Sequence, residues 1–526
     1  MSLYLNCSNL SFKKVVNSGF VDKSDLLSFL NAKLNSENGF ICVSRPRRFG
    51  KSVNAKMINA YYSKGCNSKD LFDSLNIANN DEYLQHLNKY NVIYLDMQSF
   101  KADLASGKSY LEDINQSLIP ELKAQFSECF DSDNTSSSLP EVILDIYKKT
   151  HEQFIFIIDE WDYVFRTFPN ESKLLEDYIE FLRQIFKAEP NSQAVMLAYI
   201  TGILPIKKYN TQSALNNFHE YSMVQPGPLA ESFGFTVDEV KDLCEKHNMS
   251  YAQLAEWYDG YQIGGSKGMF NPTSVMAAIY NDYCDSYWAN TSAYDTVATY
   301  IRMDFDGLQD DVIRLLAGES CSVETASFQN DLNIVRSKDD VLTSLIHLGY
   351  LSYDREQRTC HIPNREVATE FKNAIVSDSN WGVVATAIQQ SEQLLKATLD
   401  GKEEIVAAAI DTIHSDATSV LQYNDENSLA CVLTLAYYTS QKDYLRVREL
   451  PTGKGFADVV LIPRPHCNKP AVVLELKYDQ SADTAIAQIH DKRYAGILKD
   501  FAGEVVLVGI NYDKATKKHE CRIERV

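Results

Sequence analysis

The sequence predicts a multidomain α/β protein. Its first part reads as a parallel sheet covered by helices, because four apolar runs alternate there with segments of helical periodicity. The middle part is mostly helical, and the last part has another order of strands and helices, which indicates a separate α/β fold. A length of 526 residues is enough for about two to four hydrophobic cores. We place the domains at residues 1–229, 230–377 and 378–526.

The composition is that of a globular protein without a membrane-spanning segment. Hydrophobic residues make up 45% of the chain and charged residues 23%, and no apolar run is long enough to cross a bilayer. Eleven cysteines without a C-x-x-C pair favour reduced thiols, so we expect a cytoplasmic protein. The net charge of −20 argues against non-specific binding of nucleic acid, but residues 441–526 hold 15 Lys and Arg against 12 Asp and Glu. A DNA-facing surface at the C-terminal end is therefore compatible with the acidic total.

The first informative element is a strand–loop–helix segment. The apolar run Phe40–Val43 predicts a short buried strand, and Ser44–Ser52 reads S-R-P-R-R-F-G-K-S before a helical pattern that ends near Gly65. A loop that ends in Gly-Lys-Ser at the start of a helix presents backbone N–H groups to phosphate oxygens. Lys51 would reach the β- and γ-phosphates of ATP, and the Ser52 hydroxyl would ligate Mg²⁺.

This loop departs from the usual P-loop pattern at one position. The pattern G-x-x-x-x-G-K-[ST] requires a glycine where the chain has Arg45, followed by Pro46. That glycine normally relieves steric strain, so the first half of the loop must take another path. The competing interpretation is a basic surface turn before an ordinary helix. We expect the nucleotide to contact the second half of the loop: Arg48, Phe49, Gly50, Lys51 and Ser52.

A second apolar run ends in an acidic pair. Phe154–Ile158 predicts a strand covered on both faces, and Asp159 and Glu160 follow it directly. This is the position of a Walker B motif, in which Asp159 would hold Mg²⁺ and Glu160 would act as general base on the attacking water. The alternative is an exposed acidic strand end, which many α/β proteins have. The presence of Gly-Lys-Ser in the same chain favours the nucleotide site.

Two further strands complete the predicted sheet. They are the apolar runs Val92–Asp96 and Ala194–Thr201. Thr201, at the end of the second run, is a candidate for contact with the γ-phosphate. Four buried strands that alternate with helices imply a parallel sheet, and ATP would then lie at the carboxyl ends of its strands.

The sequence of the middle part, residues 230–377, does not by itself indicate a catalytic or binding site. Its pattern is helical and includes a predicted hairpin around Asp354–Arg358, which together favour a helical lid or a winged-helix domain. The aromatic residues of this part are more often packing residues than a ligand site in such proteins.

The last part predicts a second site, on adjacent strands. Predicted strands cover 456–462 and 471–478, and Glu475 and Lys477 project from the same face because strand residues alternate. Asp458 on the neighbouring strand can lie beside them. Asp458 and Glu475 would coordinate Mg²⁺ or Mn²⁺, with Lys477 orienting the water, and Glu426 on a preceding helix could add a carboxylate. The alternative is a cross-strand ion-pair cluster on a solvated face.

Several short strings in the chain match those of one protein family. In the first two parts they are Phe20–Ser24, Ser44–Ser52, Asp159–Glu160, Thr201–Pro205, Trp257–Tyr261 and Leu348–Leu351. In the last part they are Gly453–Asp458 and Glu475–Lys477, with Gln488 and Tyr494 on the following helix. The chain resembles a bacterial family in which an AAA-ATPase-like domain precedes a nuclease-like domain of the PD-(D/E)XK superfamily.

The resemblance implies function as well as fold. It implies that Asp458, Glu475 and Lys477 form a metal-dependent nuclease site, and that Arg45 is a family-wide departure that leaves ATP binding intact. The hypothesis is an ATP-binding, ATP-hydrolysing protein that gates cleavage of nucleic acid, with DNA as the expected partner and a homo-oligomer compatible with this family. The alternative is an ATP-dependent switch or scaffold whose nuclease-like domain binds nucleic acid or a partner without cleavage.

Overall fold

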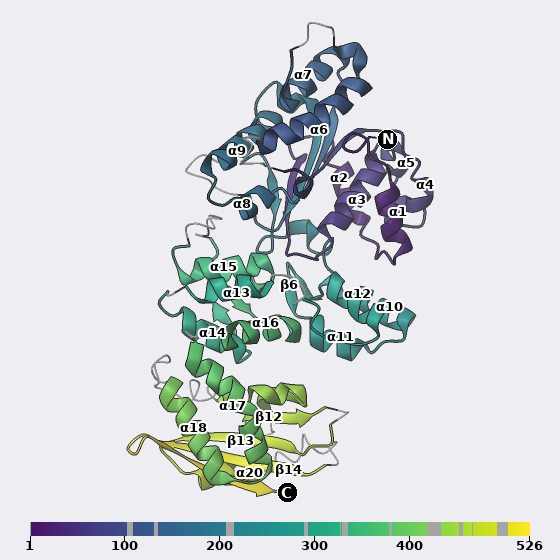
Figure 1. Ribbon diagram of the computed structural model, residues 1–526. Coiled ribbons are helices and arrows are strands. Elements are labelled where there is room, and N and C mark those ends of the chain that lie inside the picture. Colours follow the sequence, from purple (N-terminus) through teal and green to yellow (C-terminus); the bar gives the residue numbers. More distant parts are fainter. Residues whose placement is uncertain are drawn as a thin grey trace. The chain divides into compact units, whose positions relative to one another are not determined.

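The structure, a computed structural model, falls into two compact units. It describes residues 2–101, 109–130, 135–206, 215–288, 293–303, 305–326, 328, 335–377, 381–417, 433–451, 456–464, 467–491 and 503–526. The first unit comprises Met1–Tyr287 and Ser322–Val367, and the second comprises Trp288–Cys321 and Ala368–Val526. Figure 1 labels the elements of both. The division into three domains at residues 229 and 377 stays a prediction.

A five-stranded parallel sheet organises the first unit. Its strands are β1 (Phe40–Ser44), β2 (Asn91–Asp96), β3 (Phe154–Asp159), β4 (Val195–Gly202) and β5 (His219–Tyr221). Their order is β2-β3-β4-β1-β5, and every neighbouring pair is parallel. The parallel sheet and the four predicted strands are confirmed. Because β4 lies between β1 and β3, the end of β4 separates the loop that follows β1 from the acidic pair after β3.

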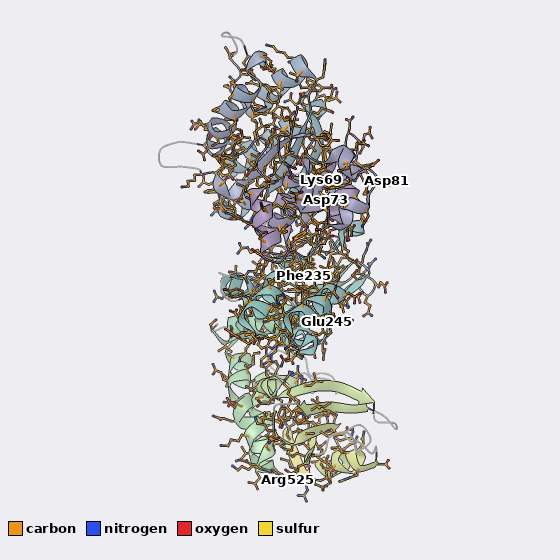
Figure 2. The ribbon with its side chains drawn as sticks, turned by 90° about the vertical axis from the view of Figure 1, so that its right-hand side faces the viewer. Lys69, Asp73, Asp81, Phe235, Glu245 and Arg525 are labelled. Atoms are coloured by element: carbon orange, nitrogen blue, oxygen red, sulfur yellow. The ribbon has the colours of Figure 1, made fainter. Side chains whose placement is uncertain are left out.

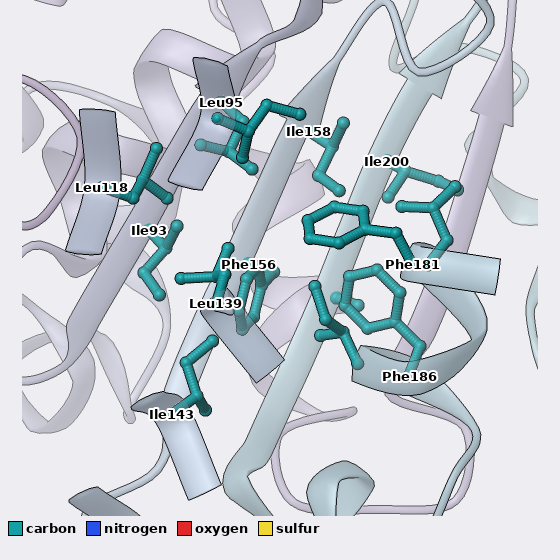
Figure 3. Close-up of a cluster of buried hydrophobic side chains, with 14 of the residues drawn as sticks. Ile93, Leu95, Leu118, Leu139, Ile143, Phe156, Ile158, Phe181, Phe186 and Ile200 are labelled. Carbon is teal, nitrogen blue, oxygen red and sulfur yellow. The ribbon is translucent and has the colours of Figure 1, made fainter. Parts of the chain in front are cut away.

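Helices cover both faces of this sheet. On one face lie α1 (Leu10–Asn17), α2 (Asp25–Asn31) and α3 (Lys51–Tyr62), and on the other lie α6 (Tyr110–Gln125), α7 (Leu139–Thr150) and α9 (Ser172–Phe186). Alternate residues of β3 pack into the two cores. Ile155 and Ile157 pack with the first group of helices. Phe156 and Ile158 pack with the second group (Figure 3). Both faces are therefore buried, as the continuous apolar runs predicted.

Short elements complete the sheet domain. They are α4 (Lys69–Phe72), α5 (Tyr83–His86) and α8 (Tyr163–Thr167). On the surface, Lys69 and Asp73 form an ion pair of 2.6 Å, one helical turn apart on and beside α4 (Figure 2). Such an exposed pair contributes little to stability, because solvent screens both charges.

The region after the sheet is helical with small hairpins. Within the first unit it contains α10 (Val237–His247), α11 (Tyr251–Tyr258), β6 (Tyr261–Ile263), β7 (Ser266–Met269), α12 (Pro272–Asn281), α15 (Lys338–Leu348), β9 (Ser352–Asp354) and β10 (Thr359–His361). Strands β9 and β10 pair antiparallel and form the predicted hairpin. Elements that reach or lie in the second unit are α13 (Ala293–Ile301), α14 (Leu308–Leu316), β8 (Cys321–Ser322), α16 (Arg365–Val376), α17 (Gly382–Leu399) and α18 (Glu403–Ala417).

A five-stranded mixed sheet organises the end of the second unit. Its strands follow chain order: β11 (Tyr444–Pro451), β12 (Phe456–Pro463), β13 (Ala471–Tyr478), β14 (Val505–Asp513) and β15 (Lys518–Arg525). Only the neighbouring pair β13 and β14 is parallel. Helix α20 (Ala482–Asp491) lies between these two strands in the chain, and its Ile486 and Ile489 pack against the sheet. The separate α/β fold predicted here is confirmed. Of the helix predicted to begin near Glu426, residues 433–436 are described and helical, whereas Glu426 itself lies outside the described residues.

No helix within the described ranges combines the length and the apolar character that a bilayer crossing requires.

Candidate nucleotide and nuclease sites

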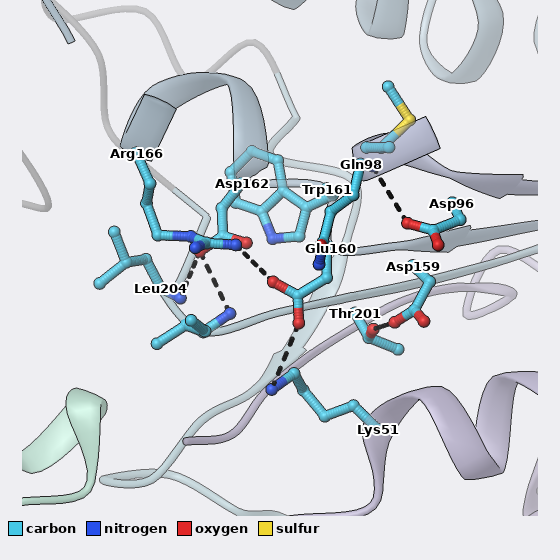
Figure 4. A network of polar contacts seen from close by, with 12 residues as sticks. Lys51, Asp96, Gln98, Asp159, Glu160, Trp161, Asp162, Arg166, Thr201 and Leu204 are labelled. Carbon is cyan, nitrogen blue, oxygen red and sulfur yellow. Dashed lines mark hydrogen bonds and ion pairs between the residues drawn. The ribbon is translucent and has the colours of Figure 1, made fainter. Parts of the chain in front are cut away.

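Lys51 lies at the carboxyl edge of the first sheet, as predicted. Gly50 has a φ of 87°, a conformation that favours glycine, and it turns the chain from the loop into α3. The Lys51 ammonium is 4% exposed and donates to the carbonyl oxygens of Arg45 at 3.0 Å and Pro46 at 2.9 Å. Its Nζ lies 3.7 Å from Oε1 of Glu160 (Figure 4). Burial lowers the pKa of Lys51, and the Glu160 carboxylate opposes that shift.

Arg45, the residue in place of the usual glycine, points into the interior. Its Nη1 donates to the carbonyl oxygens of Ser44 and Tyr221, both at 2.9 Å, and its Nη2 donates to that of Leu229 at 3.1 Å. The guanidinium also lies over the ring of Phe233, 5.2 Å from its centroid. Burial lowers the pKa of Arg45 to about 10, so it stays charged at neutral pH. Arg45 therefore fastens the end of β1 to β5 and to the chain that follows β5.

Arg48 and Phe49 contact the region that follows the sheet. Arg48 Nη1 donates to the carbonyl oxygen of Tyr287 at 2.6 Å. The Phe49 ring is fully buried edge-on against Tyr261, with 5.1 Å between centroids, and the Tyr261 hydroxyl donates to the carbonyl oxygen of Gly349 at 2.7 Å. The side chains of both loop residues are thus engaged with the region that follows the sheet. The contact of Arg48 and Phe49 with nucleotide stays a prediction, and their backbone N–H groups would have to make it.

The predicted acidic pair and Thr201 lie beside Lys51. Asp159, at the end of β3, is 3% exposed and accepts a hydrogen bond of 2.6 Å from the Thr201 hydroxyl at the end of β4. Glu160 is 8% exposed, and burial raises its pKa. The structure therefore brings together Lys51 at the start of α3, Asp159 and Glu160 at the end of β3, and Thr201 at the end of β4 (Figure 4). Thr201, predicted to sense phosphate, holds Asp159 here.

Two residues of this site, Asp162 and Arg166, were not predicted from the sequence. Asp162 Oδ2 accepts from the backbone N–H groups of Ile203 at 3.1 Å and Leu204 at 3.0 Å. Arg166 Nε lies 3.1 Å from the same oxygen, and Arg166 Nη2 pairs with Glu160 Oε2. A signal was present, because Asp162 and Arg166 are four residues apart at the start of a helix, a spacing that favours ion pairs.

The second unit places Glu475 and Lys477 together, as predicted. They are 1% and 8% exposed on β13, and Lys477 Nζ lies 3.4 Å from Glu475 Oε1. Gly509 pairs with Glu475 from β14, and a Cβ at this glycine would lie 2.5 Å from the carbonyl oxygen of Ala482 on α20. The glycine therefore allows the helix to pack closely beside the Glu475–Lys477 pair.

The remaining residues of the predicted metal site are only partly described. The register of β12 with β13 pairs Val459 with Leu474, so Asp458 and Glu475 occupy the next positions of the two strands. The side chain of Asp458 lies outside the described residues, as do Glu426 and Tyr494. Within the described part, no three His, Cys, Asp or Glu side chains are grouped to hold a metal ion.

Comparison with known proteins agrees with both halves of this description. Residues 9–211 match a family described as a predicted AAA-ATPase, and residues 424–521 match the PD-(D/E)XK nuclease superfamily. No curated protein matches the chain. The chain is also similar to a solved structure of the Aeropyrum pernix ORC2 protein (ADPNP-ADP complexes), with 11% identity and a TM-score of 0.31; the match covers 68% of this chain and 92% of that one. The chain thus joins an N-terminal region similar to a predicted AAA-ATPase family to a C-terminal region similar to the PD-(D/E)XK nuclease superfamily, as the resemblance predicted.

Proposed function

We propose that the protein binds and hydrolyses ATP and that its nucleotide state gates metal-dependent cleavage of nucleic acid, DNA in particular, by the second unit. The observation that carries the ATPase half is the convergence of Lys51, Asp159, Glu160 and Thr201 at one edge of a parallel sheet. The buried Glu475–Lys477 pair, beside the strand that carries Asp458, supports the nuclease half. A cytoplasmic homo-oligomer is part of the same proposal.

The residues at the first site fit ATP and Mg²⁺. Lys51 donates to two loop carbonyl oxygens, and phosphate oxygens can replace these acceptors because they carry more negative charge. Ser52 and Asp159 would hold Mg²⁺, which would neutralise charge on the phosphates. Glu160 would accept the proton of the attacking water, and its raised pKa suits a proton acceptor that works near neutral pH.

The residues at the second site fit a hard divalent cation. Asp458 and Glu475 would hold Mg²⁺ or Mn²⁺ through carboxylate oxygens, with Glu426 as a further candidate ligand. The metal would supply Lewis-acid stabilisation of the phosphodiester. Lys477 would place its ammonium against the charge that develops on the phosphate oxygens.

Cleavage assays with and without ATP test the gating. Plasmid and single-stranded DNA would be incubated with Mg²⁺ or Mn²⁺ and with the wild type, Asp458→Ala or Lys51→Ala. We expect cleavage that Asp458→Ala abolishes, and that ATP alters in the wild type but not in Lys51→Ala. ATP turnover without cleavage by any form would instead support the switch or scaffold. If ATP does not change the rate of DNA cleavage, gating by nucleotide is contradicted, whereas the proposed nuclease activity still holds.

Replacing Thr201 by valine tests the support of Asp159. The valine side chain keeps the volume but removes the hydroxyl that donates to Asp159 at 2.6 Å. We expect the Mg²⁺ concentration for half-maximal ATP hydrolysis to rise about tenfold, as when a partner of a metal ligand is lost. Thr201→Ser keeps the donor and is expected to stay near the wild type. An unchanged Mg²⁺ requirement in Thr201→Val would show that Asp159 does not depend on Thr201.

A further inference from the structure

Arg166 joins two carboxylates of the nucleotide site. It lies on α8, the short helix that follows the acidic pair, and its side chain is 15% exposed. Nη2 pairs with Glu160 Oε2, and Nε lies 3.1 Å from Asp162 Oδ2 (Figure 4). One planar guanidinium therefore fixes the position of the Glu160 carboxylate relative to that of Asp162.

Asp162 is itself firmly placed. It is 1% exposed, and its Oδ2 accepts from the backbone N–H groups of Ile203 and Leu204, directly after β4. A Cβ at Gly202 would lie 2.7 Å from Asp162 Oδ1, so the end of β4 packs tightly against this carboxylate. Arg166 therefore connects Glu160 to an anchor built from the end of β4.

Glu160 needs such a connection. Its φ of 57° lies in the left-handed region, which a residue with a side chain occupies only when its surroundings hold it there. Among the described residues, its cationic partners are Lys51, at 3.7 Å, and Arg166. Phosphate oxygens would draw the Lys51 ammonium toward themselves, which leaves Arg166 as the cation that holds Glu160 while ATP is bound.

We propose that Arg166 is the positioning residue for Glu160 in ATP hydrolysis. This inference rests on the proposed ATPase activity. Arg166 acts through the carboxylate that accepts the proton of water, and two of its nitrogens are already engaged with Glu160 and Asp162 rather than with a phosphate position. It follows that loss of Arg166 slows the chemical step and leaves the binding of nucleotide largely intact.

The test compares Arg166→Met and Arg166→Lys with the wild type in the full-length protein. Steady-state hydrolysis gives kcat and KM, and equilibrium binding of a non-hydrolysable ATP analogue gives Kd. For Arg166→Met we expect kcat to fall by about 100-fold, the scale of a misplaced catalytic group, with Kd and KM within about twofold of the wild type. Arg166→Lys keeps the charge and is expected to recover part of kcat. Arg183→Met, which removes an exposed ion pair with Glu180 of 2.6 Å on α9, is the matched control and should leave kcat, KM and Kd unchanged.

Each other outcome has a defined meaning. A loss of analogue affinity in Arg166→Met as large as its loss of kcat would make Arg166 a phosphate contact and overturn the positioning role. If Arg166→Met hydrolyses ATP with the kcat of the wild type, the positioning role of Arg166 is overturned but the proposed ATPase activity is not. Absence of turnover in the wild type would overturn the ATPase proposal together with the inference. A thermal unfolding curve for each variant shows whether it is folded. If Arg166→Met does not fold, kcat and Kd of Arg166→Lys are compared with those of the wild type instead.

Discussion

Replacing Lys51 by methionine is expected to lower the rate of ATP hydrolysis by at least about 100-fold, as the loss of a donor to developing charge does in other enzymes. Methionine fills most of the buried space of Lys51, which is 4% exposed, so the change removes charge more than packing. The phosphates lose the ammonium, and Glu160 loses one of its cationic partners while Arg166 remains. We also expect weaker binding of nucleotide, because Lys51 contacts phosphate in the ground state as well. Steady-state hydrolysis and equilibrium binding measure the two effects.

The matched control for this change is Lys69→Met. It too removes a lysine that pairs with a carboxylate, but Lys69 is 54% exposed and its partner Asp73 lies on the surface. Hydrolysis by Lys69→Met should equal that of the wild type. Hydrolysis by Lys51→Met at the wild-type rate would show that the loop does not bind the phosphates of the reacting nucleotide.

Replacing Glu475 by glutamine is expected to abolish metal-dependent cleavage of DNA and to lower stability. Glutamine has the shape of glutamate but lacks the charge that a hard cation requires. The change also leaves the Lys477 ammonium, 8% exposed, without the carboxylate at 3.4 Å, and breaking a buried pair in this way costs about 3 kcal/mol. Plasmid cleavage and urea unfolding followed by circular dichroism measure the two consequences.

A double variant separates these two consequences. Glu475→Gln combined with Lys477→Met removes both charges, so we expect it to regain most of the lost stability. Cleavage should remain absent, because the ligand and the ammonium are both gone. Glu504→Gln, which breaks an exposed pair with Arg525 of 2.9 Å, should change neither property. Cleavage that returns together with stability would mean that Glu475 supports the fold and not the chemistry.

The strands could be predicted because their sequences are continuous apolar runs. Phe154–Ile158 and Ala471–Tyr478 have buried faces on both sides, and few other structures accept such sequences. Strand β5 was not predicted, because His219–Tyr221 is three residues long and carries two polar residues. Strand β5 pairs with β1 through backbone hydrogen bonds, and the pattern of its side chains does not indicate this pairing.

The candidate site could be predicted only in part. Spacing alone placed Glu475 and Lys477 on one face, and the Gly-Lys-Ser string placed Lys51 at the start of a helix. The sequence could not show where the loop side chains point. Arg45 and Phe49 turn into the interior because carbonyl oxygens and aromatic rings distant in the chain receive them there, and such partners are set by the tertiary fold.

The path of the chain limits where recombination in the gene can separate the two units. The chain passes between the two units three times, after Tyr287, Cys321 and Val367. The β11 residue Arg446 donates to the carbonyl oxygen of Ala317 at 3.3 Å, so the nuclease-like unit draws on a segment that precedes the last part of the ATPase-like unit. A single recombination point in the gene would therefore separate residues that pack together. The two regions are expected to pass between genomes as one block and to diverge together.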